Sequence, residues 1–390
     1  MRQAFLPRTA YKKATGGGGT DPTDPTDPTD PTDPTPTKPN GYALVADESF
    51  AQMNVSPTAS ITLGAMGSGG TLYRCNSTSL TRTGLLPSTQ VNAVPVLNRL
   101  SRNGSMCWGF DFTFTGSVFD IDFNVASSAG WKSIQVWDGN LLCTSVPVAV
   151  TTTGNGTATV NLGTSGKRRI RIEFASDIGI YGIRTSGLVE PVAPRRKLMV
   201  IGDSWVEGST STELWPGKDG GYSRAWHLGH LTGRYLDADI YYHGIGGTAY
   251  RNGLGGDDYA ALYRIQYIAD VQPDEVLVEG SINSGNDGQG AALFYSRVSA
   301  ASPNTRIIVI GRQVLSGGPV PGADVDIEAA ALAAPNVDGF FSPGRENWVT
   351  DAQHPLYENP NSPAHPSHAG NLYYARKFAE KIVATWPVTP

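Results

Sequence analysis

The chain has little cysteine, no long apolar stretch and no surplus of positive charge. Its 390 residues include three cysteines, Cys75, Cys107 and Cys143, without a Cys-x-x-Cys pair. That spacing excludes a disulfide-built scaffold and a cysteine zinc site, although one pair could close within the first half of the chain. Lys and Arg number 30 against 35 Asp and Glu, so no nucleic acid is expected as a partner. No segment approaches the roughly 20 apolar residues of a membrane-spanning helix.

The N-terminal region also lacks the apolar core of a secretory signal, since no run of about 7–15 apolar residues follows its positive charges. Residues 20–34 repeat Thr-Asp-Pro, and proline at every third position prevents a helix or a strand ladder. We therefore predict an extended spacer over residues 20–41. Residues 1–19 are too few for a domain, and we predict a docking peptide that binds a larger assembly.

Residues 42–191 have the pattern of an antiparallel β domain. Apolar and polar residues alternate over 108–114, 119–125, 134–137, 158–162 and 169–174, and Gly, Ser, Asn and Asp separate these runs. Short alternating runs between turn residues are typical of sandwiches and jelly rolls. The sequence also has 46 glycines and 27 prolines, a composition that favours turn-rich β structure over a helical bundle. We predict a β-sandwich, jelly-roll-like in its connections.

Residues 192–390 have the pattern of an α/β domain. Short runs that are apolar on both faces, at 198–201, 275–278 and 306–310, are typical of central parallel strands. Between and after them, helical periodicity covers 223–235, 259–269, 290–301, 325–334 and 371–386. Alternation of this kind predicts three layers, with a parallel sheet between helices, and ligands at the carboxyl ends of the strands.

Four short blocks of polar residues and glycines fall where those strands end. The first is Gly202-Asp203-Ser204, directly after an apolar strand. Next come Gly244-Ile245-Gly246-Gly247-Thr248 and Glu279-Gly280-Ser281-Ile282-Asn283, and His365-Pro366-Ser367-His368 precedes the last helix. In this order and spacing, residues 197–386 resemble the SGNH (GDSL-type) hydrolase family, whose sheet is flavodoxin-like. Some carbohydrate esterases of that family also carry a jelly-roll domain in front.

The resemblance implies a role for each matching residue. Ser204 matches the nucleophile, next to Asp203 in the same motif, and His365 matches the general base. Gly247 and Asn283 match the backbone and side-chain donors to the oxyanion. The chemistry is consistent, because a serine hydroxyl needs a base and the tetrahedral intermediate needs fixed hydrogen-bond donors.

The sequence departs from the family pattern in two blocks. In the third block, Ser281 and Ser284 replace a glycine and an aspartate, so Asn286-Asp287 is an alternative match after a loop shift. In the fourth, Ser362 stands where the family has an aspartate three residues before the histidine.

Two further questions concern the base and the acid. Asp351-Ala352-Gln353-His354-Pro355 satisfies Asp-x-x-His-Pro but lacks a following helix, so we prefer His365 and keep His354 and His368 as alternatives. Asp351 could fold back as the third triad member. Alternatively, the site works as a Ser–His dyad, as in some carbohydrate esterases of the family.

The resemblance implies a serine ester hydrolase without a metal or organic cofactor. His227 and His230 are three residues apart on a predicted helix, but without an acidic partner we expect a structural role. The β domain in front favours an acylated, mainly O-acetylated, polysaccharide as substrate. An inactive glycan- or receptor-binding module and a lipid esterase are the alternatives. The docking peptide and stalk resemble those of a bacteriophage tail component, which predicts a virion or extracellular location and other tail proteins as partners of residues 1–19.

Overall fold

The protein is described here from a computed structural model. It defines residues 38–75, 77–83, 107–125, 132–175, 178–207, 228–251, 258–280, 283, 285–312, 322, 324–349, 357–359 and 362–389. The predicted docking peptide (residues 1–19) and nearly all of the predicted Thr-Asp-Pro spacer (20–41) lie outside these residues. The described residues belong to one unit, which runs from Thr37 to Pro390.

The second half of the chain forms a five-stranded parallel sheet. Its strands are β11 (Lys197–Gly202), β12 (Asp239–Gly244), β13 (Glu275–Gly280), β14 (Arg306–Arg312) and β15 (Val337–Phe341). They lie in the order β12-β11-β13-β14-β15, and all four neighbouring pairs are parallel. This is the flavodoxin-like order, with the topological switch point beside β11, where such sheets bind ligands. The predicted parallel sheet is confirmed.

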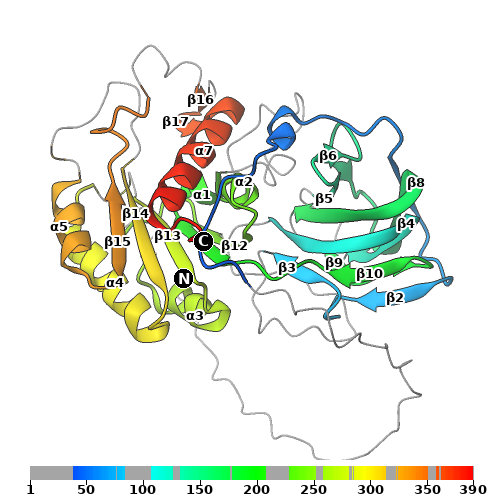
Figure 1. Ribbon diagram of the computed structural model, residues 1–390, viewed down its shortest axis with the longest axis horizontal. Coiled ribbons are helices and arrows are strands. Elements are labelled where there is room, and N and C mark those ends of the chain that lie inside the picture. Colours follow the sequence, from blue (N-terminus) through cyan, green and yellow to red (C-terminus); the bar gives the residue numbers. More distant parts are fainter. Residues whose placement is uncertain are drawn as a thin grey trace, which may run out of the picture. The chain divides into compact units, whose positions relative to one another are not determined.

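Helices cover both faces of this sheet (Figure 1). They are α1 (Ser204–Glu207), α2 (Leu228–Tyr235), α3 (Leu262–Val271), α4 (Gly288–Ala301), α5 (Val325–Ala333) and α7 (His368–Thr385). Leu198 and Val200 of β11 point to a core shared with α1, α2 and α7. Met199 and Ile201, which alternate with them, point to a core shared with α3, α4 and α5. Burial on both faces explains why these strands are apolar throughout.

The first half of the chain forms one network of antiparallel strands. They are β1 (Ser60–Gly64), β2 (Thr71–Arg74), β3 (Thr81–Thr83), β4 (Cys107–Val125), β5 (Ser133–Asp138), β6 (Leu141–Leu142), β7 (Val148–Ala149), β8 (Gly154–Ala175), β9 (Gly179–Thr185) and β10 (Leu188–Pro191). The main path is β2-β9-β4-β8-β5-β6. The predicted antiparallel β region is confirmed, while its jelly-roll connections stay a prediction.

Two strands of this region are longer than the alternation indicated. The predicted runs 108–114 and 119–125 are both part of β4, and 158–162 and 169–174 are both part of β8. The register of β4 against β8 shifts between Gly116 and Val118, so Gly116 marks an irregularity inside a strand rather than a turn between two strands. A Cβ at Gly116 would lie 2.5 Å from the Phe114 ring, which only glycine avoids.

Buried ion pairs join the antiparallel strands of residues 60–191 (the β region) to the sheet and helices of residues 197–385 (the α/β region). Glu173 of β8 accepts hydrogen bonds from Arg234 of α2 (2.7 Å) and from Trp137 Nε1 (2.9 Å), and it also contacts His230. The segment before β1 packs on the α/β region as well. Tyr42 forms a bridge with Pro387, and its hydroxyl donates to Glu275 at the start of β13. These contacts hold the described residues of both regions together.

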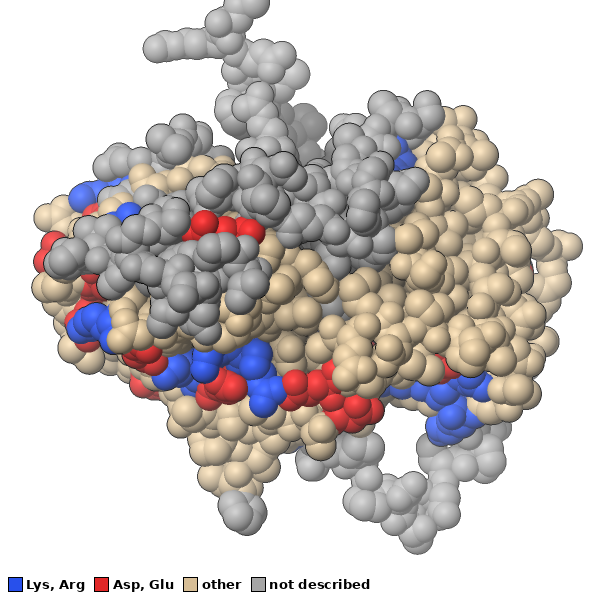
Figure 2. Space-filling view, turned by 90° about the horizontal axis from the view of Figure 1, so that it is seen from above, with Lys and Arg blue, Asp and Glu red and all other residues tan. Residues whose placement is uncertain are grey.

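The surface carries charges of both signs close together. On the face shown in Figure 2, basic and acidic side chains are interspersed in a band, and most of the remaining described surface is uncharged. That arrangement differs from the continuous basic stripe of a nucleic-acid-binding face. Among the described helices, none is long and apolar enough to span a membrane.

Candidate active site

Ser204 lies where the central strand β11 turns into α1. Gly202 ends the strand, Asp203 follows, and Ser204 is the first residue of the helix. A Cβ at Gly202 would lie 2.3 Å from Val206, so a glycine is required for the helix to start this close to the strand. The turn leaves Ser204 half-buried at the carboxyl edge of the sheet.

His365 contacts Ser204, although 161 positions separate them in the sequence. Its Nε2 atom lies 2.8 Å from the Ser204 Oγ, within hydrogen-bond distance. His365 belongs to β17 (Ser362–Pro366), a short strand paired with β16 (Glu358–Asn359). The next residue but one, Ser367, caps α7 by accepting a hydrogen bond from the Gly370 N–H. The cap fixes the start of α7 and, through it, the end of β17.

Burial lowers the pKa of His365 below the ordinary value of 6.5, because a charged imidazolium loses hydration there. The ring is therefore neutral at neutral pH. A neutral Nε2 can accept the hydroxyl proton of Ser204, as a general base must.

The turn after β12 is packed against α1. Gly246 donates its N–H to the Glu207 carboxylate (2.9 Å), and a Cβ at Gly246 would lie 3.8 Å from the Ser204 Cβ. Gly247 follows with φ of +75°, a conformation that glycine adopts without strain. The second block thus lies beside Ser204, where the resemblance predicted an oxyanion donor.

Asn283 links the first block to the second. Its Nδ2 donates to the Asp203 carboxylate (3.0 Å) and to the Thr248 carbonyl (2.9 Å). Asp203 is fully buried and also accepts a hydrogen bond from the Trp205 N–H (3.0 Å). The Asn283 amide therefore holds the loops of the first and second blocks together.

The alternative match in the third block has a different position. The Asn286 side chain accepts hydrogen bonds from the N–H groups of Asp326 and Ile327 at the start of α5 (2.8 and 3.2 Å). Asp287 caps α4 by accepting from the Gly290 N–H. The structure thus places Asn283, rather than Asn286, next to Asp203.

Among the alternative bases, His368 is the first residue of α7, and burial lowers its pKa to about 4. Within the described residues, His365 is the histidine that contacts Ser204. His354, the predicted acid Asp351 and the two serines Ser281 and Ser284 lie outside the described residues.

The remaining histidine of interest, His230, is buried against Glu173 at the contact between the two regions. Glu173 is an acidic partner that the sequence pattern did not indicate, but the buried position of His230 at this contact fits the structural role predicted for it. His227 lies outside the described residues. Within the described part of the chain, no group of three His, Cys, Asp or Glu side chains is placed to hold a metal ion.

Sequence reasoning missed the residues that support the second block. The Glu207 carboxylate accepts a hydrogen bond from the Gly246 N–H, and the Arg264 guanidinium donates to the Thr248 hydroxyl (3.0 Å). Arg264 is fully buried and lies next to the Tyr259 ring, with its charge 5.1 Å from the ring centre. A lone Glu or Arg on an expected helix gives no pattern by which these roles could be recognised.

No family model and no curated protein matches the sequence. Solved structures do match the fold. A family two carbohydrate esterase from Cellvibrio japonicus has a TM-score of 0.58 at 15% identity, over 84% of this chain and 98% of that chain. The acetyl xylan esterase Est2A from Butyrivibrio proteoclasticus gives 0.57 at 15% identity, over 84% and 98%. A GDSL-like lipase structure from Bacteroides ovatus gives 0.51 at 13%, over 85% and 100%.

The chain has the SGNH hydrolase fold. The match extends beyond the α/β region, because more than four fifths of the chain is covered in all three comparisons, including much of the β region. At 13–15% identity these likenesses establish the fold alone.

Proposed function

We propose that this protein is a serine ester hydrolase that removes O-acetyl groups from a polysaccharide. The observation that carries the proposal is the 2.8 Å contact between Ser204 Oγ and His365 Nε2 at the switch point of the parallel sheet. A serine hydroxyl held by a neutral imidazole at the ligand-binding edge of an α/β sheet is the arrangement that nucleophilic acyl transfer requires.

In the proposed reaction, Ser204 Oγ attacks the ester carbonyl while His365 takes the hydroxyl proton. His365 then gives that proton to the leaving sugar oxygen, which leaves an acetyl group on Ser204. Water attacks this acyl-enzyme with His365 again as the base, and acetate departs. The half-buried imidazole must become charged twice in each cycle, so an acceptor at its other nitrogen would raise the rate.

The oxyanion forms beside the second block in this proposal. The Gly247 N–H and the Asn283 amide are the proposed donors, together with the N–H of Ser204 itself. Each such donor contributes about 3–4 kcal/mol when it is aimed at the developing charge. The buried Asp203 orients Asn283 and therefore acts as a positioning residue.

Two observations support a polysaccharide substrate. The fold matches a structure that its authors describe as an acetyl xylan esterase, and this match includes the β region in front of the hydrolase sheet. The Cellvibrio japonicus structure is likewise that of a carbohydrate esterase, and it is matched over 84% of this chain. We further propose, from the Thr-Asp-Pro repeat and the short segment before it, that the protein is a bacteriophage tail component that acts on the host envelope. Loss of particle incorporation on deletion of residues 1–19 would support that location, and unchanged incorporation would refute it.

The first test is hydrolysis of p-nitrophenyl acetate, butyrate and octanoate by the wild type, Ser204→Ala and Ser296→Ala. Ser296 lies exposed on α4 and is the matched control. We expect acetate to be preferred, Ser204→Ala to lose at least about 10³-fold in kcat, and Ser296→Ala to match the wild type. Acetate release from acetylated xylan, measured by proton NMR, then tests the substrate class.

Other outcomes would change the proposal in defined ways. Equal rates for wild type and Ser204→Ala on every ester would favour a glycan-binding module without catalysis, and a preference for octanoate would favour a lipid esterase. The base is tested by His365→Ala against His354→Ala and His368→Ala. Loss of activity in Asp351→Ala, with wild-type folding, would establish Asp351 as the acid of a triad rather than the dyad.

A further inference from the structure

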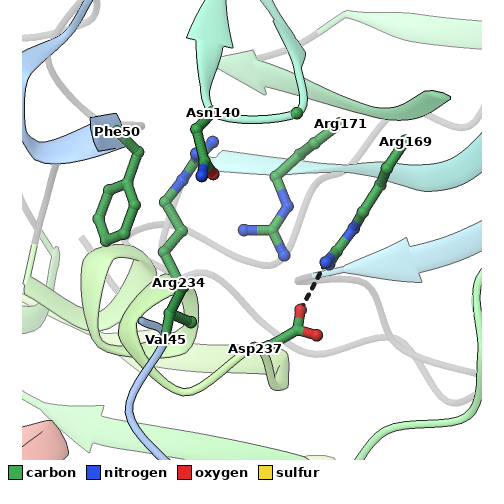
Figure 3. A pocket seen from close by; sticks show the side chains of 8 residues that line it. Val45, Phe50, Asn140, Arg169, Arg171, Arg234 and Asp237 are labelled. Carbon is green, nitrogen blue, oxygen red and sulfur yellow. Dashed lines mark hydrogen bonds and ion pairs between the residues drawn. The ribbon is translucent and has the colours of Figure 1, made fainter. Parts of the chain in front are cut away.

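A cavity lies between the β region and the α/β region, lined by residues of both (Figure 3). Its volume is about 300 Å³, at the small end of the range for ligand pockets. Arg169 and Arg171 of β8 form one wall, and Arg234 of α2 forms the opposite wall. Asp237 lies at the edge, and Phe50 closes one side. Three arginines thus surround a space large enough for a small ligand.

The cavity is separate from the candidate active site. Arg234 and Asp237 lie just before β12, at the end of the sheet where the parallel strands begin. Ser204 follows β11, at the end where the strands finish. β11 and β12 run side by side from Lys197 and Asp239 to Gly202 and Gly244, which separates the two ends by about 15–20 Å. A ligand in this cavity would not touch Ser204.

Among the described residues, Arg171 makes no short ion pair, although Asp111, Glu173 and Asp239 all attract its charge. Its nearest carboxylate among the described residues, Asp111, lies 3.3 Å away, longer than the roughly 2.7–2.9 Å of a strong charge-assisted hydrogen bond. Asp111 is already used by two other arginines. Arg169 makes two bonds to it (2.9 and 2.7 Å), and Arg195 makes a third (2.9 Å). Arg171 therefore has donors to spare, although its side chain is only 7% exposed.

The Arg171 guanidinium is directed into the cavity. Figure 3 shows it reaching from β8 into the middle of the space, between Arg234 and Arg169. A buried guanidinium has five N–H donors in a fixed plane and cannot lose its proton at physiological pH. Burying it with a single long ion pair is costly unless another acceptor completes the set. An anionic ligand would supply that acceptor.

The other charged groups around the cavity leave its inner surface positive. Arg234 pairs with Glu173 and lies over the Trp137 ring at 3.7 Å, and burial lowers its pKa to about 10, so it is still charged at neutral pH. Asp237 pairs with Arg169 at the edge and is 53% exposed. The carboxylates Asp111 and Glu173 pair with these arginines and are not among the residues that line the cavity, and Asp47 is bonded to Asn140. Burial lowers the pKa of His230, so it adds no positive charge.

The rest of the lining suits a sugar more than a bare ion. Val45 and Phe50, from the segment before β1, provide an apolar side, and Asn140 of the β region provides an amide. We propose that this cavity is a second ligand site that binds the carboxylate of an acidic sugar residue. The carboxylate contacts Arg171 at the centre and Arg234 and Arg169 on either side, while the sugar ring lies against Phe50.

The experiment is isothermal titration of the full-length protein with D-glucuronate at constant ionic strength. Glucose is the neutral control, and inorganic sulfate and phosphate test for a simple anion site. Arg171→Gln removes the central guanidinium. Arg184→Gln is the matched control, since Arg184 is 13% exposed and pairs with the buried Asp122 elsewhere in the β region. Ser204→Ala should bind as the wild type does, which separates this site from catalysis.

We expect one glucuronate per chain, no binding of glucose, at least about tenfold weaker binding in Arg171→Gln, and wild-type affinity in Arg184→Gln. Absence of saturable glucuronate binding, or equal affinity in Arg171→Gln, would overturn the proposal. Sulfate or phosphate binding as tightly as glucuronate would also overturn it, in favour of an inorganic anion.

A second variant keeps the test decisive if Arg171→Gln does not fold. Asp237→Asn removes the carboxylate that competes for Arg169. Its backbone has φ of +47°, which asparagine tolerates well, so the fold should be kept. Tighter glucuronate binding in Asp237→Asn would support the site, and unchanged affinity would refute it.

Discussion

Glu173 is a buried carboxylate at the contact between the two regions. It is buried at 1% exposure and accepts hydrogen bonds from Arg234 (2.7 Å) and Trp137 (2.9 Å), with His230 also in contact. Glu173→Gln keeps the shape but removes the charge, which leaves the Arg234 guanidinium buried without its counterion. Breaking a buried pair in this way costs about 3–5 kcal/mol. We expect a loss of about 3 kcal/mol, because the glutamine oxygen still accepts one bond.

The assay is urea unfolding followed by tryptophan fluorescence, with Glu190→Gln as the control. Glu190 pairs with Lys167 at the surface, where the side chains are 38% and 64% exposed, so that change should cost less than about 1 kcal/mol. A loss below 1 kcal/mol in Glu173→Gln would refute the reasoning, since the charge would then not be needed for the contact.

The same reasoning predicts how this difference depends on pH. Burial alone would raise the pKa of Glu173, but the charge of Arg234 and a hydrogen bond from His230 hold it below its ordinary value. A carboxyl with a depressed pKa stabilises the fold above its unfolded-state pKa and loses this contribution as the pH falls. The stability difference between wild type and Glu173→Gln should therefore be full at pH 7 and shrink below about pH 4. A difference that grew on acidification would contradict this assignment.

Three further predictions concern catalysis. Burial lowers the pKa of His365 below 6.5, so kcat/KM for p-nitrophenyl acetate should rise with pH, with its midpoint below pH 6.5, and then stay level. A midpoint above pH 7 would exclude His365 as a buried neutral base. Asn283→Ala should lower kcat about 10²–10³-fold with little change in KM, and an unchanged kcat would remove Asn283 from the oxyanion site. Gly247→Ala puts a Cβ on a backbone with φ of +75°, so it should lower the free energy of unfolding by about 1–2 kcal/mol and also lower kcat. The control Gly154→Ala, at φ of +90°, should lose similar stability and keep its activity.

The parallel sheet could be predicted from the sequence because the signal is local. Residues 198–201, 275–278 and 306–310 are apolar at every position, and each lies in a strand with both faces buried. The blocks that follow these strands meet at one edge because parallel strands all end there. The resemblance to the SGNH family then assigned Ser204, Gly247 and Asn283 to one site at this edge.

The extent of the β strands could not be predicted in the same way. Glycines and polar residues separate the alternating runs, and the same residues form a turn or an irregularity inside a strand according to what packs across them. At Gly116 the Phe114 ring occupies the place of a Cβ, and β4 continues. Local pattern contains no information about that neighbour.

The sequence by itself therefore determined the order of strands and helices and the identity of the residues at the ends of the strands. The tertiary structure alone decided which histidine contacts Ser204. In the sequence, 161 positions separate Ser204 from His365, and His354 and His368 are also candidates. It also decided that Arg169, Arg171 and Arg234 surround one cavity. Alternation placed Arg169 and Arg171 on the same face of a strand, but the partner of that face comes from a helix more than 60 positions away, as the Arg234–Glu173 pair shows. Charges interact through space, so their environment is known only when the chain has folded.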